Sequence, residues 1–261
     1  MITEPSTLLS RPNPSSHLHR PFTIAAIRTE NYRTKTLVFH ASLPAQPGQF
    51  VMAWLPGVDE KPFSIASAEP LALTVVAVGP FSEALHRLAI GDRVWIRGPL
   101  GQGYQLEGKR LLLVGGGYGV APLLFLARIA IAAGCAVQVC IGARTAVEVL
   151  LVEDLERAGA SVSITTEDGS LGMAGLVTTA TEAAISSHRP DAVYACGPVK
   201  MLEAIDRQCE AYNLSRQLSW EAHMRCGIGL CGSCEASSSQ PAAQRGSGWL
   251  VCLDGPVSFS R

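Results

Sequence analysis

The hydrophobic pattern of the chain changes near residue 111, and this change constrains the fold more than any other feature. Before it, short apolar runs alternate with prolines and glycines between residues 21 and 104. Several strands at such close spacing are typical of a small barrel or sandwich. After it, continuous apolar strands alternate with helical segments, which indicates a parallel sheet with helices on its faces.

This pattern predicts a multi-domain chain with an antiparallel β-barrel, an α/β parallel-sheet domain and a small cysteine-rich C-terminal segment. Strands are expected at 22–28, 35–40, 49–54, 71–78, 93–97, 111–115, 136–142, 161–167 and 191–197, and helices at 121–133, 147–158 and 198–212. The predicted divisions are a mobile tail at 1–20, the barrel at 21–104, the α/β domain at 105–215 and the C-terminal segment at 216–261.

Charge and composition exclude several classes of protein. Lysine and arginine number 21 against 22 aspartates and glutamates, so the basic excess of a nucleic-acid binder is missing. The chain is 48% hydrophobic, too apolar for a disordered protein. No uncharged apolar run reaches the roughly 18 residues of a membrane span, and residues 1–20 lack the apolar core of a signal peptide. We therefore expect a cytoplasmic protein that binds neither nucleic acid nor membrane.

The strongest motif is C-x4-C-x2-C, formed by Cys226, Cys231 and Cys234, with a fourth thiol at Cys252. This spacing is typical of plant-type [2Fe–2S] proteins. The glycines between the cysteines let a loop wrap a cluster and aim N–H groups at its sulfurs. Structural zinc is the main alternative, but zinc ribbons usually present two C-x2-C pairs. The other cysteines lie in apolar segments, where a buried free thiol is usual; they are Cys135, Cys140, Cys196 and Cys209.

A glycine-rich turn follows the strand at 111–115 and opens a helix. Its glycines are Gly115, Gly116, Gly117 and Gly119. Such a turn lets a pyrophosphate approach the backbone at a helix N-terminus, although a plain tight turn is the alternative. A second strand–helix turn, with Cys196, Gly197 and Pro198, would lie at the same edge of the sheet and favours a nucleotide there. Cys196 is then either a packed thiol or a group beside a nicotinamide.

A third motif, in the barrel region, is residues 47–50 (PGQF) followed by 61–65 (KPFSI). A cation and a hydroxyl on one extended strand can bind a phosphate and a ring heteroatom. Taken alone, the two segments are more simply a turn and an edge strand.

In this order, the three motifs resemble the ferredoxin reductase superfamily, which pairs a flavin-binding barrel with a nicotinamide-binding α/β domain. The C-terminal stretches MRCGIGLCGSCEA and CLDGPVSF are similar to those of electron-transfer subunits of NAD-linked, two-subunit dihydroorotate dehydrogenases. The resemblance runs from about residue 21 to 259. It implies three cofactors or substrates: FAD, a [2Fe–2S] cluster and NAD(H).

The resemblance also assigns residues to these groups. For the flavin they are Lys61, Pro62, Phe63, Ser64, Val76, Ala77, Val78, Phe81 and Ser82; for the nicotinamide nucleotide, Gly115, Gly116, Gly117, Gly119, Cys196, Gly197 and Pro198; for the cluster, Cys226, Cys231, Cys234 and Cys252. Lys61 stands where the family usually has arginine, so the charge is kept but the planar fork is lost.

The implied activity passes electrons from FMN in a separate catalytic subunit through the cluster and FAD to NAD⁺, in pyrimidine biosynthesis. Nicotinamide accepts a hydride and the cluster passes single electrons, so a flavin between them is the natural converter. The resemblance further implies a heterotetramer of two plus two subunits. No catalytic acid–base pair is predicted in this chain, and Glu221 and His223 are given no role.

Three alternatives remain at this point. The same module resembles reductase subunits of cytoplasmic hydrogenases and of ferredoxin:NAD(P) oxidoreductases, and a zinc-stabilised nucleotide sensor is a third reading.

Arg144 follows a strand where an adenosine ribose is expected, so it either binds the 2′-phosphate of NADP or is a solvated loop residue. The polar stretch at 237–248 is predicted as a surface loop, and the cluster segment is expected to face a partner.

Overall fold

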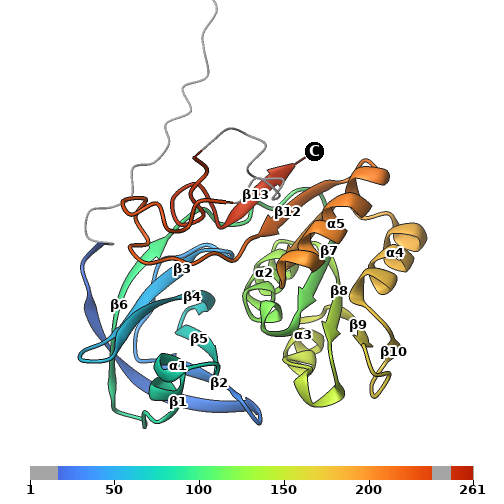
Figure 1. The fold of residues 1–261 in the computed structure, drawn as a ribbon. Helices are drawn as coiled ribbons and strands as arrows, with labels where there is room; N and C mark the ends of the chain where they lie inside the picture. The colour runs from blue at the N-terminus through green and yellow to red at the C-terminus, as the bar shows by residue number, and fades with distance from the viewer. Residues whose placement is uncertain (1–16, 237–247, 261) are drawn as a thin grey trace, which may run out of the picture.

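The computed structural model describes residues 17–236 and 248–260. Figure 1 shows two lobes side by side, a β-barrel from the first part of the chain and an α/β sheet from the second. The C-terminal segment, orange to red, leaves the sheet, runs over one end of the barrel and returns to the sheet. The predicted fold class is confirmed. The predicted loop at 237–248, except its last residue, and the predicted tail as far as residue 16 lie outside the described residues.

The barrel is a closed antiparallel sheet in the order β1-β2-β5-β4-β3-β6. Its strands are β1 (Arg20–Asn31), β2 (Thr34–Phe39), β3 (Phe50–Leu55), β4 (Asp59–Ala68), β5 (Leu71–Val76) and β6 (Arg93–Leu100). Apolar side chains at alternating strand positions fill its interior, which is how small barrels form a core; among them are Ile24, Leu37, Val51, Ile65 and Leu73, each at most 1% exposed.

The predicted strand at 71–78 is too long, because the structure ends it at Val76. The hydroxyl of Ser82 accepts hydrogen bonds from the backbone N–H groups of Val78 and Gly79, at 2.9 and 3.1 Å. These bonds turn the chain out of the sheet and into helix α1 (Pro80–His86), which the apolar pattern did not predict.

The second lobe is a seven-stranded sheet in the order β10-β9-β8-β7-β11-β12-β13. Its elements are β7 (Arg110–Gly116), α2 (Val120–Ala132), β8 (Ala136–Ala143), α3 (Val152–Ala158), β9 (Ser161–Thr166), β10 (Met173–Ala174), α4 (Val177–His188), β11 (Ala192–Cys196), α5 (Val199–Ala211), β12 (Ser215–Ser219) and β13 (Val257–Ser260). All neighbours are parallel except β13, which pairs antiparallel with β12. The sheet therefore extends into the segment predicted to hold the cluster.

Two parts of this lobe differ from the sequence prediction. The helix expected at 147–158 is a short 3₁₀ turn at Ala146–Glu148 and a separate helix α3. The break comes at Leu151, which has a left-handed backbone (φ 61°) and is buried in the sheet core with Leu150. Strand β12 was not predicted, because its sequence is polar; inside the protein Arg216 pairs with Asp206 at 2.6 Å.

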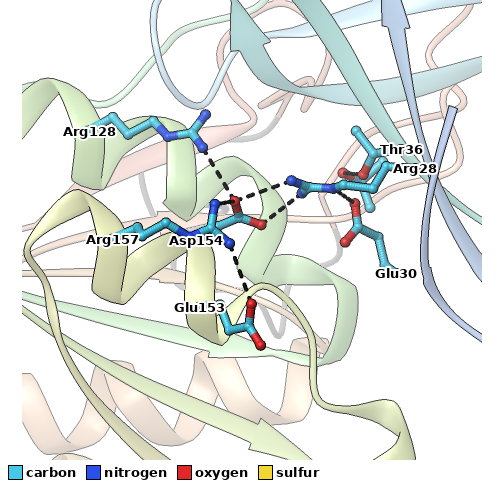
Figure 2. Close-up of polar contacts among 8 residues, drawn as sticks. Arg28, Glu30, Thr36, Arg128, Glu153, Asp154 and Arg157 are labelled. Carbon is cyan, nitrogen blue, oxygen red and sulfur yellow. Dashed lines mark hydrogen bonds and ion pairs between the residues drawn. The ribbon is translucent and has the colours of Figure 1, made fainter. Parts of the chain in front are cut away.

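The two lobes contact each other through a helix and a group of charges. Phe125 on helix α2 packs into the barrel core, whereas its neighbours on the same helix pack into the sheet core. Figure 2 shows Asp154 of α3 facing Arg28 of β1, with Arg128 and Arg157 on its other sides. The closest of these ion pairs is Arg28–Asp154 at 2.8 Å. The interface thus fixes the barrel against the edge of the sheet that carries the predicted nucleotide turns.

Candidate functional site

The two predicted nucleotide turns meet at the carboxyl edge of the sheet. Strands β7 and β11 pair directly, so the turns after them lie side by side. A Cβ added at Gly119 would lie 2.3 Å from the carbonyl oxygen of Cys196, and one at Gly116 would lie 2.8 Å from the Pro198 ring. These glycines are therefore required for the turns to pack. Gly117 differs, because it has a φ of +55° and open space around it.

A cavity of 560 Å³ begins at these turns and extends along the ends of β8 and β9. Gly116, Gly117 and Pro198 line one end, and Arg144 lies at the other end. Residues of the barrel, including Arg33, cover it from the opposite side. In open α/β sheets ligands bind outside the carboxyl ends of strands, next to the point where the strand order reverses, and that point here lies between β7 and β11. The cavity therefore fits an extended dinucleotide.

A second cavity of 300 Å³ lies between the barrel, the turns and the residues after β12. Its predicted flavin residues are Pro62, Phe63, Ser64, Val76 and Val78; Tyr118, Gly119, Cys196, Trp220 and Glu221 also line it. Walls that are mostly apolar, with a few polar groups, suit a flat heteroaromatic ring such as that of a flavin. Tyr118 and Val76 line both cavities, so the two adjoin. Adjacent sites are what hydride transfer between a flavin and a nicotinamide requires.

Four residues predicted for the flavin lie elsewhere. Lys61 forms an ion pair with Asp59 at 2.5 Å and does not line the cavity. Ala77 is also absent from the cavity wall. Phe81 is buried in the barrel core, with its ring 6.1 Å from that of Phe63. The Ser82 hydroxyl is engaged in the local bonds that begin helix α1, including one that it donates to the carbonyl of Gly79.

Cys196 is a buried thiol that faces the second cavity. Burial raises its pKa to about 12, and the nearby charge of Glu221 acts in the same direction. The thiol therefore stays neutral at physiological pH and packs against whatever occupies the cavity. Glu221, to which the sequence analysis gave no role, also lines this cavity. Partial burial raises its pKa, and it hydrogen-bonds to Tyr118.

The four C-terminal cysteines lie close to one another. The Cys231 thiol interacts with Cys226, and the Cys252 thiol interacts with Cys234 and Cys226. Within the described ranges, no three side chains of His, Cys, Asp or Glu converge on a single ion-sized site. A loop with the spacing C-x4-C-x2-C and a fourth cysteine far along the chain suits a two-iron cluster, in which each iron takes two cysteines, better than one tetrahedral zinc ion.

Backbone donors and the barrel hold this cluster loop in place. The N–H groups of Gly229 and Leu230 point at the sulfurs of Cys252 and Cys226, at 3.2 and 3.3 Å. Such donors stabilise the negative charge that a bound cluster places on its sulfurs. Arg97 of β6, which sequence reasoning missed, donates to the carbonyl of Cys226 at 2.8 Å. The only sequence signal was that Arg97, unlike Arg93 at the start of the same strand, follows a run of apolar residues.

Comparison with known proteins agrees with this geometry. Residues 221–260 match the family model "Iron-sulfur cluster binding domain of dihydroorotate dehydrogenase B", and residues 113–207 match "Oxidoreductase NAD-binding domain". A probable dihydroorotate dehydrogenase B (NAD(+)) electron transfer subunit from Thermococcus kodakarensis is 40% identical over 92% of this chain and 96% of its own length. The chain belongs to the family of dihydroorotate dehydrogenase B electron transfer subunits. A relative with the same name from Methanothermobacter thermautotrophicus is 38% identical over 91% of this chain and 88% of its own.

Solved structures place this family member among the ferredoxin reductases. The structure titled "Insights into flavin-based electron bifurcation via the NADH-dependent reduced ferredoxin-NADP oxidoreductase structure" superposes with a TM-score of 0.79 at 27% identity. The superposition covers 91% of this chain and 87% of the chain in that structure. A cytochrome P450 reductase from Amycolatopsis superposes with a TM-score of 0.64 at 26% identity, over 75% and 67%. Among the described helices, none has the length and apolar character needed to cross a membrane.

Proposed function

We propose that this chain is the subunit of an NAD-linked dihydroorotate dehydrogenase that delivers electrons from the catalytic subunit to NAD⁺. The observation that carries the proposal is that three sites adjoin. The dinucleotide cavity meets the second cavity at Tyr118 and Val76, and the cluster loop packs on the barrel end that closes the second cavity. The names of the relatives supply the substrate and the direction toward NAD⁺.

Each site has residues suited to one group. The second cavity would hold the ring of FAD between Phe63, Ser64 and Val76 of the barrel and Tyr118 of the turn. The four cysteines would hold a [2Fe–2S] cluster, and the 560 Å³ cavity would receive NAD(H). When bound, FAD and the cluster supply the conversion between single-electron and hydride transfer.

The chain's own residues position these groups and exclude water. Gly117 and the N-terminus of helix α2 present backbone N–H groups to a pyrophosphate. Trp220, itself 2% exposed and held by a hydrogen bond to Ser258, forms a rigid wall of the second cavity. Met224 packs with Met52 of the barrel next to the cysteines, so the cluster loop and the cavity share one core.

The surface around the cluster loop suits a partner. Leu230 is 81% exposed and Leu253 is 46% exposed, beside the exposed thiol of Cys231. Large apolar side chains gathered on an exposed surface mark interaction sites. The partner in this proposal is a catalytic subunit with FMN, in an assembly of two plus two subunits. The reducing cytoplasm, where thiols stay available to a cluster, is the proposed location.

Co-purification from the host tests this function. The complex should release FAD and FMN in near-equal amounts and form NADH from dihydroorotate and NAD⁺. Cys231→Ser is the variant that tests the role of the cluster. Its complex should still contain the partner and still oxidise dihydroorotate with an artificial electron acceptor, but it should form no NADH.

A second candidate is a ferredoxin:NAD(P) oxidoreductase subunit, which the 27% identity to such a structure favours. In that case the complex would contain FAD, extra iron and no FMN. It would also show no response to dihydroorotate.

A further inference from the structure

The far end of the dinucleotide cavity holds a group of opposite charges that the proposed function does not use. Glu148 lies in the 3₁₀ turn after β8, and its carboxylate is only 11% exposed. Arg144 donates to it through Nε at 3.0 Å, with a second bond from the same guanidinium. Arg33, from the barrel turn between β1 and β2, donates to the same carboxylate at 2.9 Å. One glutamate therefore holds two arginines from two lobes.

This end of the cavity is where an adenosine ribose belongs. A pyrophosphate at Gly117 and the start of α2 leaves the rest of the cavity, which runs past the ends of β8 and β9, for the adenosine. Arg144 follows directly after β8 and Glu167 directly after β9, and both line the cavity. The sequence left open whether Arg144 serves a 2′-phosphate.

The ion pairs decide against a 2′-phosphate. A phosphate there needs an arginine whose donors are available, but Glu148 takes donors from both arginines. Its pKa is lowered by these bonds, first by that from Arg144, so it stays ionised at physiological pH. Arg33, Arg144 and Lys200 are the cations that line the cavity, against the carboxylates of Glu148 and Glu167. Both arginines are paired with Glu148, and carboxylate acceptors beside them suit the two hydroxyls of an unphosphorylated ribose.

We infer that Glu148 is the residue that selects NAD(H) over NADP(H), because it holds Arg144 and Arg33 away from a 2′-phosphate. The inference rests on the proposed function and names a specificity-determining residue for it. Glu148 acts through the arginines, and its removal should turn the same pocket toward the phosphorylated nucleotide.

The test measures binding of ADP-ribose and 2′-phospho-ADP-ribose to the full chain by titration calorimetry. The two probes differ only in the 2′-phosphate, so the result depends on neither the flavin nor the partner. The wild-type chain should bind ADP-ribose at least about tenfold more tightly. Glu148→Gln should tighten 2′-phospho-ADP-ribose binding about ten- to a hundredfold, the worth of a charge-assisted hydrogen bond, and change ADP-ribose binding less than about threefold.

Two further variants identify the cause. Glu148→Gln combined with Arg144→Ala should lose most of the gain, because the freed guanidinium is gone. Glu153→Gln removes the same charge from an 88% exposed position on α3 and should change neither affinity. A thermal unfolding curve for each variant reports whether the fold is intact.

The inference would be overturned if the wild-type chain bound the two probes with equal affinity, or if Glu148→Gln did not bind 2′-phospho-ADP-ribose more tightly. It would also be overturned if Glu148→Gln lost its affinity for both probes, or if the tighter binding persisted when Arg144→Ala was added. The proposed function fails separately. If the probe affinities are as expected but the complex forms no NADH from dihydroorotate, the inference about Glu148 stands and the proposed function is refuted.

Discussion

Arg28 of the barrel and Asp154 of the sheet lobe are 126 residues apart and form a two-point ion pair, with N–O distances of 3.2 and 2.8 Å. The carboxylate is 10% exposed and has two more arginines around it, whereas Arg28 is 47% exposed. A largely buried acceptor with three cations cannot be removed without leaving charges that repel one another. This contact therefore links the stability of the two lobes.

Asp154→Asn should lower the free energy of unfolding by about 1–3 kcal/mol, because the carboxylate that balances three arginines is lost. Urea unfolding followed by fluorescence measures the change. Glu153→Gln, one residue away and 88% exposed, should stay within about 0.5 kcal/mol of the wild type. Equal effects in the two variants would show that Asp154 contributes no more than a surface charge.

Arg97→Met should release iron about tenfold faster than the wild type, because the cluster loop loses the charge-assisted bond to the carbonyl of Cys226. The measurement is the decay of visible absorbance in the presence of a chelator. Arg93→Met changes an exposed arginine on the same strand and is the control. A decay rate equal to that of Arg93→Met would mean that the loop is held by its apolar contacts alone.

Glu60 makes the stability of the barrel, at the end next to the cluster loop, dependent on pH. Burial acts to raise its pKa, but hydrogen bonds from Arg97 and His19 outweigh burial and lower it below 4.5. An acid with a lowered pKa stabilises the fold above its unfolded value, and this contribution is lost as pH falls through the folded value. Glu60→Gln should therefore melt about 2–4 °C lower at pH 7, and the difference should shrink toward pH 3. A constant difference across this range would contradict the ion pair.

Gly119→Ala should destabilise the protein by at least about 2 kcal/mol, since its methyl group would meet the carbonyl of Cys196 in the neighbouring turn. Gly117→Ala meets no atom and costs about 1 kcal/mol, through its left-handed backbone alone. Thermal unfolding compares the two variants. The reverse order of stability would show that these turns do not depend on close packing.

Cys252→Ser should abolish the part of the visible absorption that the cluster contributes, leave that of the flavin, and reduce the iron content of the purified protein. Cys209→Ser, at a buried thiol in the sheet core, should leave both unchanged. Absorption spectra and metal analysis of the two variants make the test. A colourless wild-type protein that contains zinc would support the zinc alternative instead.

The sequence predicted those parts of the fold whose chemistry is local. Short apolar runs mark most strands, and the cysteine spacing follows from what one loop can wrap. Strand β4 was not among the strands predicted from the apolar pattern, because Pro62 and three charged residues obscure that pattern. Its motif at 61–65 was interpreted as an edge strand, whereas in the closed barrel it pairs with both β3 and β5. Helix α1 was not predicted at all, since a single hydroxyl at Ser82 turns the chain there.

Contacts between distant residues explain what the sequence could not show in the candidate site. The bond from Arg33 to Glu148 joins residues 115 apart, and Arg97 and Cys226 are 129 apart. Their pairing is set by how the barrel sits against the sheet. The sequence predicts a nucleotide at the glycine-rich turn, but packing against Cys196 in the neighbouring turn accounts for Gly119.

Strand β13 pairs with β12 through Val257–Ser260, almost the last residues of the chain. All four cysteines lie between these two strands, so the pairing of β13 with β12 closes the loop that carries them. We expect this pairing to precede insertion of the metal, because the nicotinamide lobe then holds both ends of the loop. A truncation of a few C-terminal residues would leave every cysteine in place and still disrupt cluster maturation.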